Sequence, residues 1–135
     1  MSNEEIEPGS PKDWLRHAFS DLELAHIAPN EKILLEDLCF HAQQAAEKAL
    51  KAVLVANGIP YPKTHNIRTL LELLPQNVTP SQGIQDASIL TDYAVISRYT
   101  GDFEPVTEDE HQEAFRLAES VVKWAEGIIK GVKRV

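Results

Sequence analysis

The chain has 135 residues, which suits one domain with an ordinary core, and its composition (43% hydrophobic and 25% charged residues) is that of a globular protein. Its formal net charge of −8 argues against a protein that grips duplex DNA unaided, because neutralising phosphates requires clustered lysine and arginine. With a single cysteine, no signal peptide and no apolar stretch of membrane-spanning length, we expect a cytoplasmic protein without an internal disulfide or a membrane span.

The first ten residues are polar and acidic, and we expect them to form a flexible segment ahead of the folded domain. A helix is predicted to begin at Ser10 and Pro11, because serine caps helices and proline suits the first helical position. Apolar residues from Trp14 to Ala25 recur at helical spacing, and a Pro-Asn pair ends the pattern. The helical domain is therefore expected to span residues 11–135.

The second predicted helix runs from about Glu31 to Ala56 and has strong helix propensity. Alanine recurs along one face, which would let another helix approach closely. Glu47 and Lys51 stand at i,i+4 in the order that stabilises a helix. Gly58 is the expected stop, because glycine readily adopts the left-handed conformation in which many helices end.

Two further helices are predicted before the last one. Residues 67–74 have helical spacing and end before a proline, and a polar segment then leads to a fourth helix expected over Ile84 to Ser97. The residues of this fourth helix that we expect to be buried are Ile84, Ala87, Ile89, Leu90, Ala94 and Val95.

The fifth helix has the clearest start, because Thr107 and Glu110 fit a capping box and the acids between them suit the positive end of the helix dipole. Apolar residues then continue at helical spacing to Ile129. Alternation typical of strands is rare throughout the chain. The fold class is therefore predicted to be all-α, an up-and-down antiparallel bundle of five helices.

Positive charge gathers in one stretch of this acidic chain, since no aspartate or glutamate occurs between residues 48 and 71. The cationic and titratable side chains of that stretch are Lys48, Lys51, Lys63, His65 and Arg68. The segment PKTHN leads into a helix start, whose free backbone N–H groups favour an anion, so Lys63, Thr64 and His65 are candidates to bind phosphate. The alternative is that Thr64 or Asn66 only caps the third helix while Lys63 stays solvated.

Carboxylates and histidines share helix faces in two places. They are Asp13, His17 and Asp21 in the first helix, and Asp37 and His41 in the second. Zinc needs three or four converging ligands, so surface hydrogen bonding is the expected role and no metal is predicted. The sequence contains no glycine-rich phosphate loop and no common hydrolase motif, so no cofactor is predicted either.

The segment SRYTGDFEP, residues 97–105, interrupts two helices. Arg98 can hold a phosphate bidentately, and Tyr99 and Phe103 offer faces on which a base can stack. The alternative is that both aromatic side chains close the end of the bundle while Arg98 pairs with a nearby acid.

Three blocks of sequence together resemble the HEPN (higher eukaryotes and prokaryotes nucleotide-binding) domain family. They are Gln-Ala-x-Glu-Lys-x-x-Lys at residues 44–51, Lys-Thr-His at 63–65 and Arg-Tyr at 98–99. The resemblance covers most of the chain and rests on the order and spacing of the blocks. It implies an all-α bundle that is usually a homodimer, often beside a minimal nucleotidyltransferase and in many cases within a toxin–antitoxin pair.

Many HEPN proteins are metal-independent ribonucleases, and the motif that the resemblance brings is an arginine and a histidine with four to six residues between them, so that the histidine stands five to seven positions after the arginine. Here Phe103, Glu104 and Pro105 stand at those positions after Arg98. RNA cleavage needs a base for the 2′-OH proton and a cation for the charge that develops on phosphorus. Arg98 can supply the cation, but the base would have to be His111, one turn inside the fifth helix, so autonomous enzyme activity is not expected.

Three functions follow as hypotheses. The first is a module that binds a nucleotide or RNA and interacts with a nucleotidyltransferase as a homodimer. Its candidate ligand-binding residues are Lys63, His65, Arg98 and Tyr99, with Lys48 and Lys51 in support. The second is a ribonuclease that uses Arg98 and His111, and the third is a helical protein that only dimerises.

Overall fold

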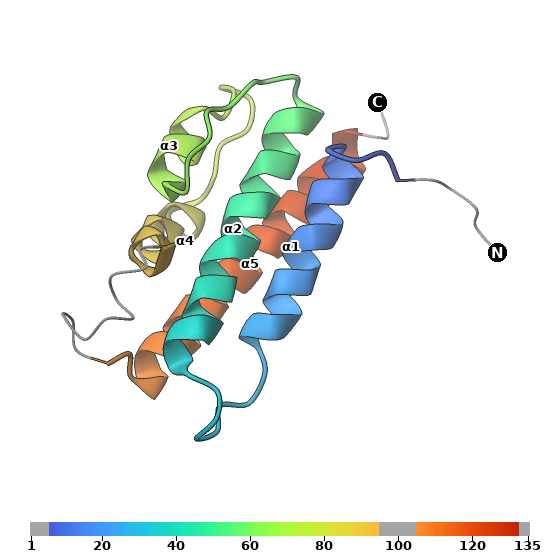
Figure 1. Ribbon diagram of the computed structural model, residues 1–135. Helices are drawn as coiled ribbons and strands as arrows, with labels where there is room; N and C mark the ends of the chain where they lie inside the picture. The colour runs from blue at the N-terminus through green and yellow to red at the C-terminus, as the bar shows by residue number, and fades with distance from the viewer. Residues whose placement is uncertain (1–5, 95–104, 133–135) are drawn as a thin grey trace.

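The computed structural model describes residues 6–94 and 105–132. Its elements are the α-helices α1 (Pro11–Ala25), α2 (Leu35–Ala56), α3 (Ile67–Glu72), α4 (Gln82–Gln85) and α5 (Glu108–Val132), with the 3₁₀ helix η1 (Asp86–Ala94) directly after α4 (Figure 1). No β-strand occurs within these described residues, so the all-α fold class is confirmed. None of the helices in this part of the chain is long and apolar enough to cross a membrane.

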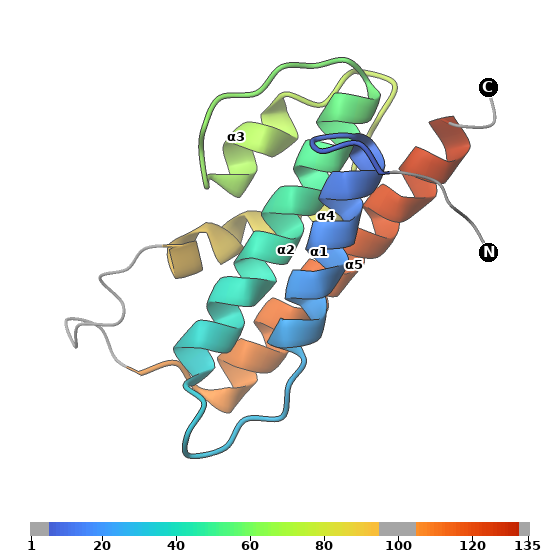
Figure 2. The same cartoon turned by 45° about the vertical axis from the view of Figure 1, so that its right-hand side comes forward.

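The long helices α1, α2 and α5 form the bundle together with a leg of short elements, α3, α4 and η1, and their arrangement can be followed in Figure 1 and Figure 2. α1 runs down the molecule and α2 returns beside it. The elements α3, α4 and η1 then carry the chain back along the other side of α2, and α5 rises again. α2 contacts α1, α3, η1 and α5, so it is the central helix. The predicted up-and-down bundle is confirmed, with its third leg divided into short pieces.

The buried face of α2 is built largely from alanine. Its fully buried alanines are Ala42, Ala45, Ala46, Ala49 and Ala52. Larger apolar side chains, including Leu50, Leu54 and Val121, belong to the same core, and each contributes about 2 kcal/mol through burial. The small side chains explain how α1 and α5 can both pack against one helix.

The predicted starts of α1 and α5 are confirmed by their hydrogen bonds. Ser10 Oγ accepts a hydrogen bond from the backbone N–H of Asp13 at 3.2 Å. At the start of α5, the N–H of Glu110 donates to Thr107 Oγ1 at 3.1 Å, and the N–H of Thr107 donates to Glu110 Oε1 at 3.0 Å. Both helices therefore begin where side-chain oxygens satisfy their free N–H groups.

Gly58 ends α2 as the sequence predicts. Its φ of +69° lies in the left-handed region. The N–H of Ile59 donates to the carbonyl of Leu54 at 2.9 Å, and the N–H of Gly58 donates to that of Val55 at 3.0 Å. This pair of bonds is a Schellman motif, which satisfies carbonyls that the helix leaves free.

The start of α2 differs from the prediction, because the helix begins at Leu35 and not at Glu31. Asn30 forms a turn that occupies the intervening residues. Its Oδ1 accepts a hydrogen bond from the N–H of Lys32 at 2.7 Å, and its carbonyl accepts one from the N–H of Ile33 at 3.0 Å. An asparagine that bonds the backbone locally in this way competes with the helix.

The predicted fourth helix, Ile84 to Ser97, consists of α4 followed by the 3₁₀ helix η1, and residues 95–97 lie outside the described residues. Buried or half-buried side chains recur at intervals of three, namely Ile84, Ala87, Leu90 and Tyr93. A 3₁₀ helix has three residues per turn, so this spacing keeps them on one face. Ile89 falls between these positions and is exposed, so the expectation that it is buried is wrong.

Candidate ligand-binding surface

Asp21 of α1 is a buried carboxylate that joins α1 to α2. Its Oδ2 accepts a hydrogen bond from Lys48 Nζ at 2.6 Å, and its Oδ1 lies 3.0 Å from His41 Nδ1. An ionised carboxylate only accepts hydrogen bonds, so His41 Nδ1 carries a proton and donates it here. We call these three residues the Asp21 cluster.

Glu47 of α2 is the centre of a second cluster of the same kind. Its Oε2 accepts from Lys51 Nζ at 2.8 Å, and its Oε1 accepts from His65 Nδ1 at 2.8 Å. Gln43 Nε2 donates both to Glu47 Oε1 at 3.1 Å and to the backbone carbonyl of His65 at 3.0 Å. This Glu47 cluster (Gln43, Glu47, Lys51 and His65) therefore ties the connector between α2 and α3 to α2.

The hydrogen bonds at Glu47 keep its carboxyl group ionised. Burial by itself raises the pKa of Glu47, but hydrogen bonds from Lys51, His65 and Gln43 outweigh it and lower the pKa below the ordinary value. The carboxylate therefore neutralises the Lys51 ammonium throughout the neutral pH range.

Lys51 is enclosed by aromatic rings as well as by its carboxylate. Its Nζ lies 5.3 Å from the centre of the Trp14 ring and 5.4 Å from that of Tyr61. The two rings meet edge to face at 6.3 Å, and the Lys51 side chain is only 11% exposed. Lys51 is thus a structural cation, held by a carboxylate and two ring faces.

The capping role expected of Thr64 or Asn66 in the connector before α3 is taken by Asn66. Asn66 Oδ1 accepts from the N–H of Thr69 at 3.2 Å, and Thr64 Oγ1 accepts from the N–H of Asn66 at 3.0 Å. Lys63 is exposed and forms no ion pair within the described residues. Because α3 has only six residues, its N-terminus offers little dipole to an anion.

Residues 48–71 contain no acid, but carboxylates from outside this stretch pair with its lysines in the structure. Asp21 reaches Lys48 from α1, and Glu47 lies one turn before Lys51 on the same helix. These two lysines are neutralised one by one, so neither supplies free positive charge. Among the candidate ligand-binding residues that the structure describes, Lys63 and His65 remain exposed. Because His65 contacts Glu47 through Nδ1, its Nε2 is the ring nitrogen that can contact a ligand.

Sequence reasoning missed the cross-helix partners in these clusters. It paired Asp21 with His17, and His41 with Asp37, by i,i+4 spacing, whereas the structure pairs Asp21 with His41. One signal was present, because Asp21 lies on the apolar stripe of α1, four residues before the buried Ala25. A carboxylate on a buried stripe needs a partner from a neighbouring helix.

His111, the candidate ribonuclease base, has a structural role in the described residues. The side chain is 8% exposed, and its Nε2 lies 2.7 Å from the carbonyl oxygen of Ala25 at the end of α1. A carbonyl accepts, so Nε2 donates and cannot take a proton from a substrate. The other candidates, Arg98 and Tyr99, lie outside the described residues.

No group of three or more histidine, cysteine, aspartate or glutamate side chains is arranged to hold a metal ion in residues 6–94 and 105–132. The carboxylate–histidine contacts that do occur are pairs, such as His17 Nε2 and Asp13 Oδ1 at 3.5 Å. Their roles are hydrogen bonding and ion pairing.

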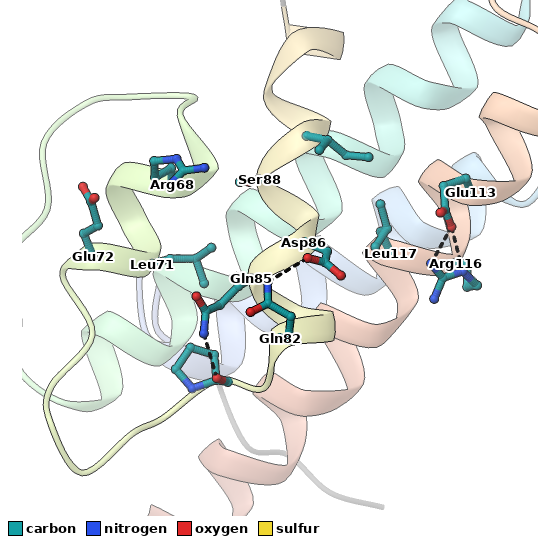
Figure 3. Close-up of a pocket in the computed structure, with 12 residues that line it drawn as sticks. Arg68, Leu71, Glu72, Gln82, Gln85, Asp86, Ser88, Glu113, Arg116 and Leu117 are labelled. Carbon is teal, nitrogen blue, oxygen red and sulfur yellow. Dashed lines mark hydrogen bonds and ion pairs between the residues drawn. The ribbon is translucent and has the colours of Figure 1, made fainter.

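A groove of about 760 Å³ lies elsewhere, between α3, η1 and α5 (Figure 3). Its lining residues include Arg68, Leu71, Asp86, Arg116 and Leu117. Its charged side chains are of both signs, and Arg116 Nε already donates to Glu113 at 2.7 Å. None of the candidate ligand-binding residues that the structure describes lines this groove, so the groove and the two clusters are separate features.

The structure is a helical bundle whose central helix, α2, carries the buried polar residues Gln43, Glu47 and Lys51 at intervals of four. Comparison with known proteins identifies the family of this bundle. The family model for the HEPN domain matches residues 11–128. The chain belongs to the HEPN domain family.

Relatives match over nearly the whole chain. "Putative toxin MJ1304" of Methanocaldococcus jannaschii is 27% identical, over 92% of this chain and 93% of its own. The crystal structure of ST0689, an archaeal HEPN homologue, is 31% identical with a TM-score of 0.72, over 89% of this chain and 98% of that one. The crystal structure of TT1696 from Thermus thermophilus is 31% identical with a TM-score of 0.75, over 87% and 97%.

Proposed function

We propose that the protein is a cytoplasmic HEPN interaction module that binds a nucleotide or RNA, acts as a homodimer, and works with a minimal nucleotidyltransferase in a toxin–antitoxin-like pair. The observation that carries the proposal is the match of the family model over residues 11–128. It is supported by the relative MJ1304, named as a toxin, which aligns over almost all of both chains. An interaction role, and not a hydrolytic one, agrees with the structural use of His111.

The ligand region of the proposal comprises Lys63, His65, Arg98 and Tyr99, with Lys48 and Lys51 in support. The Glu47 cluster supports it, because a buried carboxylate fixes His65 while 67% of that side chain stays exposed. Lys63 stands two residues before His65 on the same connector and is exposed. The neutralised Lys48 and Lys51 then orient other groups and do not contact the ligand directly.

Three measurements test the proposal. Light scattering should give twice the mass of one chain, and co-expression with a small nucleotidyltransferase encoded beside it should yield a complex that survives purification. Millimolar ATP should raise the melting temperature, because a ligand that binds only the folded state stabilises it by mass action. A monomer with no shift from any nucleotide and no complex would contradict the proposal.

A further inference from the structure

The Asp21 and Glu47 clusters are built in the same way. In each, one carboxylate oxygen accepts from a lysine ammonium (Lys48 or Lys51) and the other from the Nδ1 of a histidine. Both carboxylates are buried, with exposed fractions of 7% for Asp21 and 3% for Glu47. Two separate elements, α1 and α2, supply the two carboxylates, so the repeat does not come from one sequence motif.

Within the described part of the chain, each histidine has a second nitrogen without a partner. His41 and His65 face their carboxylates through Nδ1, and neither Nε2 has a hydrogen-bond or ion-pair partner among the described residues. Both side chains reach solvent, with 32% of His41 and 67% of His65 exposed. In the neutral ring Nε2 can only accept a hydrogen bond, whereas in the protonated ring it donates one.

The charge of each cluster depends on its histidine. With the ring neutral, the carboxylate and the lysine cancel, so the cluster carries no net charge. With the ring protonated, the cluster carries one positive charge, and the new donor is the outward Nε2. The cluster itself therefore attracts an anion only after its histidine takes up a proton, because the carboxylate already neutralises the lysine.

The charged groups around the two histidines favour His65. Beside His41 stand its own cluster and, one turn earlier on α2, the exposed Asp37. Beside His65 stand its own cluster and the exposed Lys63, while Asp92 of η1 is exposed and forms no ion pair with His65 within the described residues. In the chain, the exposed neighbour of His65 is thus a cation, two residues before it, and that of His41 is an acid, four residues before it.

We propose that the two clusters are proton-gated phosphate sites, in which His65, helped by Lys63, binds one phosphate group and His41 binds a second, each only as the imidazolium. The proposal rests on the ligand region proposed above, and it adds His41 and the requirement for protonation. A mononucleotide needs only the His65 position, whereas a single-stranded RNA can use both. Neutral clusters on an acidic surface would then release the ligand as the pH rises.

The test is an NMR titration of the full chain with ATP and, separately, with a short oligouridine RNA. Each is measured at about pH 5.5 and about pH 8, which lie on either side of the titration range of imidazole. We expect the dissociation constant for both to be at least roughly tenfold lower at the acid pH. The ring resonances of His65 should move with either ligand, and those of His41 with RNA alone.

Matched histidine variants identify the groups responsible. His65→Gln should abolish the pH dependence of ATP binding. His41→Gln should weaken the binding of RNA at the acid pH and leave the binding of ATP unchanged. The control is His17→Gln, since His17 is an exposed histidine beside a carboxylate, Asp13, but belongs to neither cluster. The His17→Gln chain should bind ATP and RNA with the same dissociation constants as the unmodified chain at both pH values.

The outcomes separate the two proposals. No binding of ATP or RNA at either pH would overturn both the ligand region and its gating. Equal binding at the two pH values, or a pH dependence that survives in the doubly substituted His41→Gln, His65→Gln chain, would overturn the gating and leave the ligand region standing. Because the ring resonances are followed in the unmodified chain, a poorly folded variant does not prevent the decision.

Discussion

At the scale of single residues, a substitution in the Glu47–Lys51 pair should lower the stability strongly, because the pair is buried. Glu47→Gln removes the charge that balances the enclosed Lys51 ammonium, and we expect the free energy of unfolding to fall by about 3 kcal/mol. Urea denaturation measures it. The matched control is Glu119→Gln, which breaks an exposed pair with Lys123 at the same i,i+4 spacing and should cost less than about 0.5 kcal/mol. Equal losses would show that burial is not the reason.

The lowered pKa of Glu47 gives the stability a pH dependence of known sign. A carboxyl group whose pKa is lower in the folded than in the unfolded protein stabilises the fold above its unfolded pKa. That contribution is lost as the pH falls through the folded pKa. Since the ordinary value is 4.5, the urea midpoint should drop as the pH is taken below it, and it should drop less steeply in Glu47→Gln. Parallel curves for the two proteins would contradict this role of Glu47.

His111 is expected to affect stability and not catalysis. His111→Ala leaves the buried carbonyl of Ala25 without its donor, so the free energy of unfolding should fall by about 1 to 3 kcal/mol. Gln112→Ala, at the exposed neighbouring position, should change it by less than about 0.5 kcal/mol. If instead the folded chain cleaves RNA to 2′,3′-cyclic phosphate ends and His111→Ala loses that activity while keeping its stability, the ribonuclease hypothesis stands.

At the scale of helices, two glycines should respond in opposite directions to the same substitution. Gly58→Ala forces a Cβ into the left-handed conformation that ends α2 and should destabilise by about 1 kcal/mol. Gly127→Ala lies inside α5, where a Cβ meets nothing within 4 Å, and should stabilise by up to about 1 kcal/mol. Thermal unfolding of both variants decides this, and a loss of stability in both would indicate that Gly127 is needed for packing.

Helix starts and stops could be predicted because their causes are local. The Ser10 cap, the capping box of Thr107 and the stop at Gly58 each depend on residues a few positions apart. The delayed start of α2 was missed, because Asn30 bonds its own turn in preference to a helix. The 3₁₀ form of η1 was also missed, although its buried residues recur at intervals of three.

The candidate site was harder to predict than the fold, because its pairings join distant parts of the chain. Asp21 and Lys48 meet across two helices, and His65 reaches Glu47 from a connector. Periodicity assigns a residue to a face but does not say which charge lies opposite. The sequence therefore located the cationic residues but did not predict that carboxylates pair with Lys48 and Lys51.

At the scale of the whole molecule, the charge distribution explains why these pairings matter. The chain carries a formal charge of −8, so any anionic ligand approaches against repulsion unless a local positive group outweighs it. The two clusters hold four of the positively charged or titratable groups that could do so, and they cancel the two lysines internally. Among the candidate ligand-binding residues that the structure describes, Lys63 and the His65 ring are the ones that no lysine–carboxylate pair uses up.

Association of two chains should be visible in the unfolding of the whole molecule. The described core is continuous across α1, α2, η1 and α5, so heating should give one cooperative transition. If the proposed homodimer is the folded species, mass action makes the melting temperature rise over a roughly hundredfold increase in protein concentration. Calorimetry together with sedimentation at the same concentrations measures this. A melting temperature independent of concentration, with sedimentation as a single chain, would rule out the homodimer and leave a monomeric module whose partner must be a different protein.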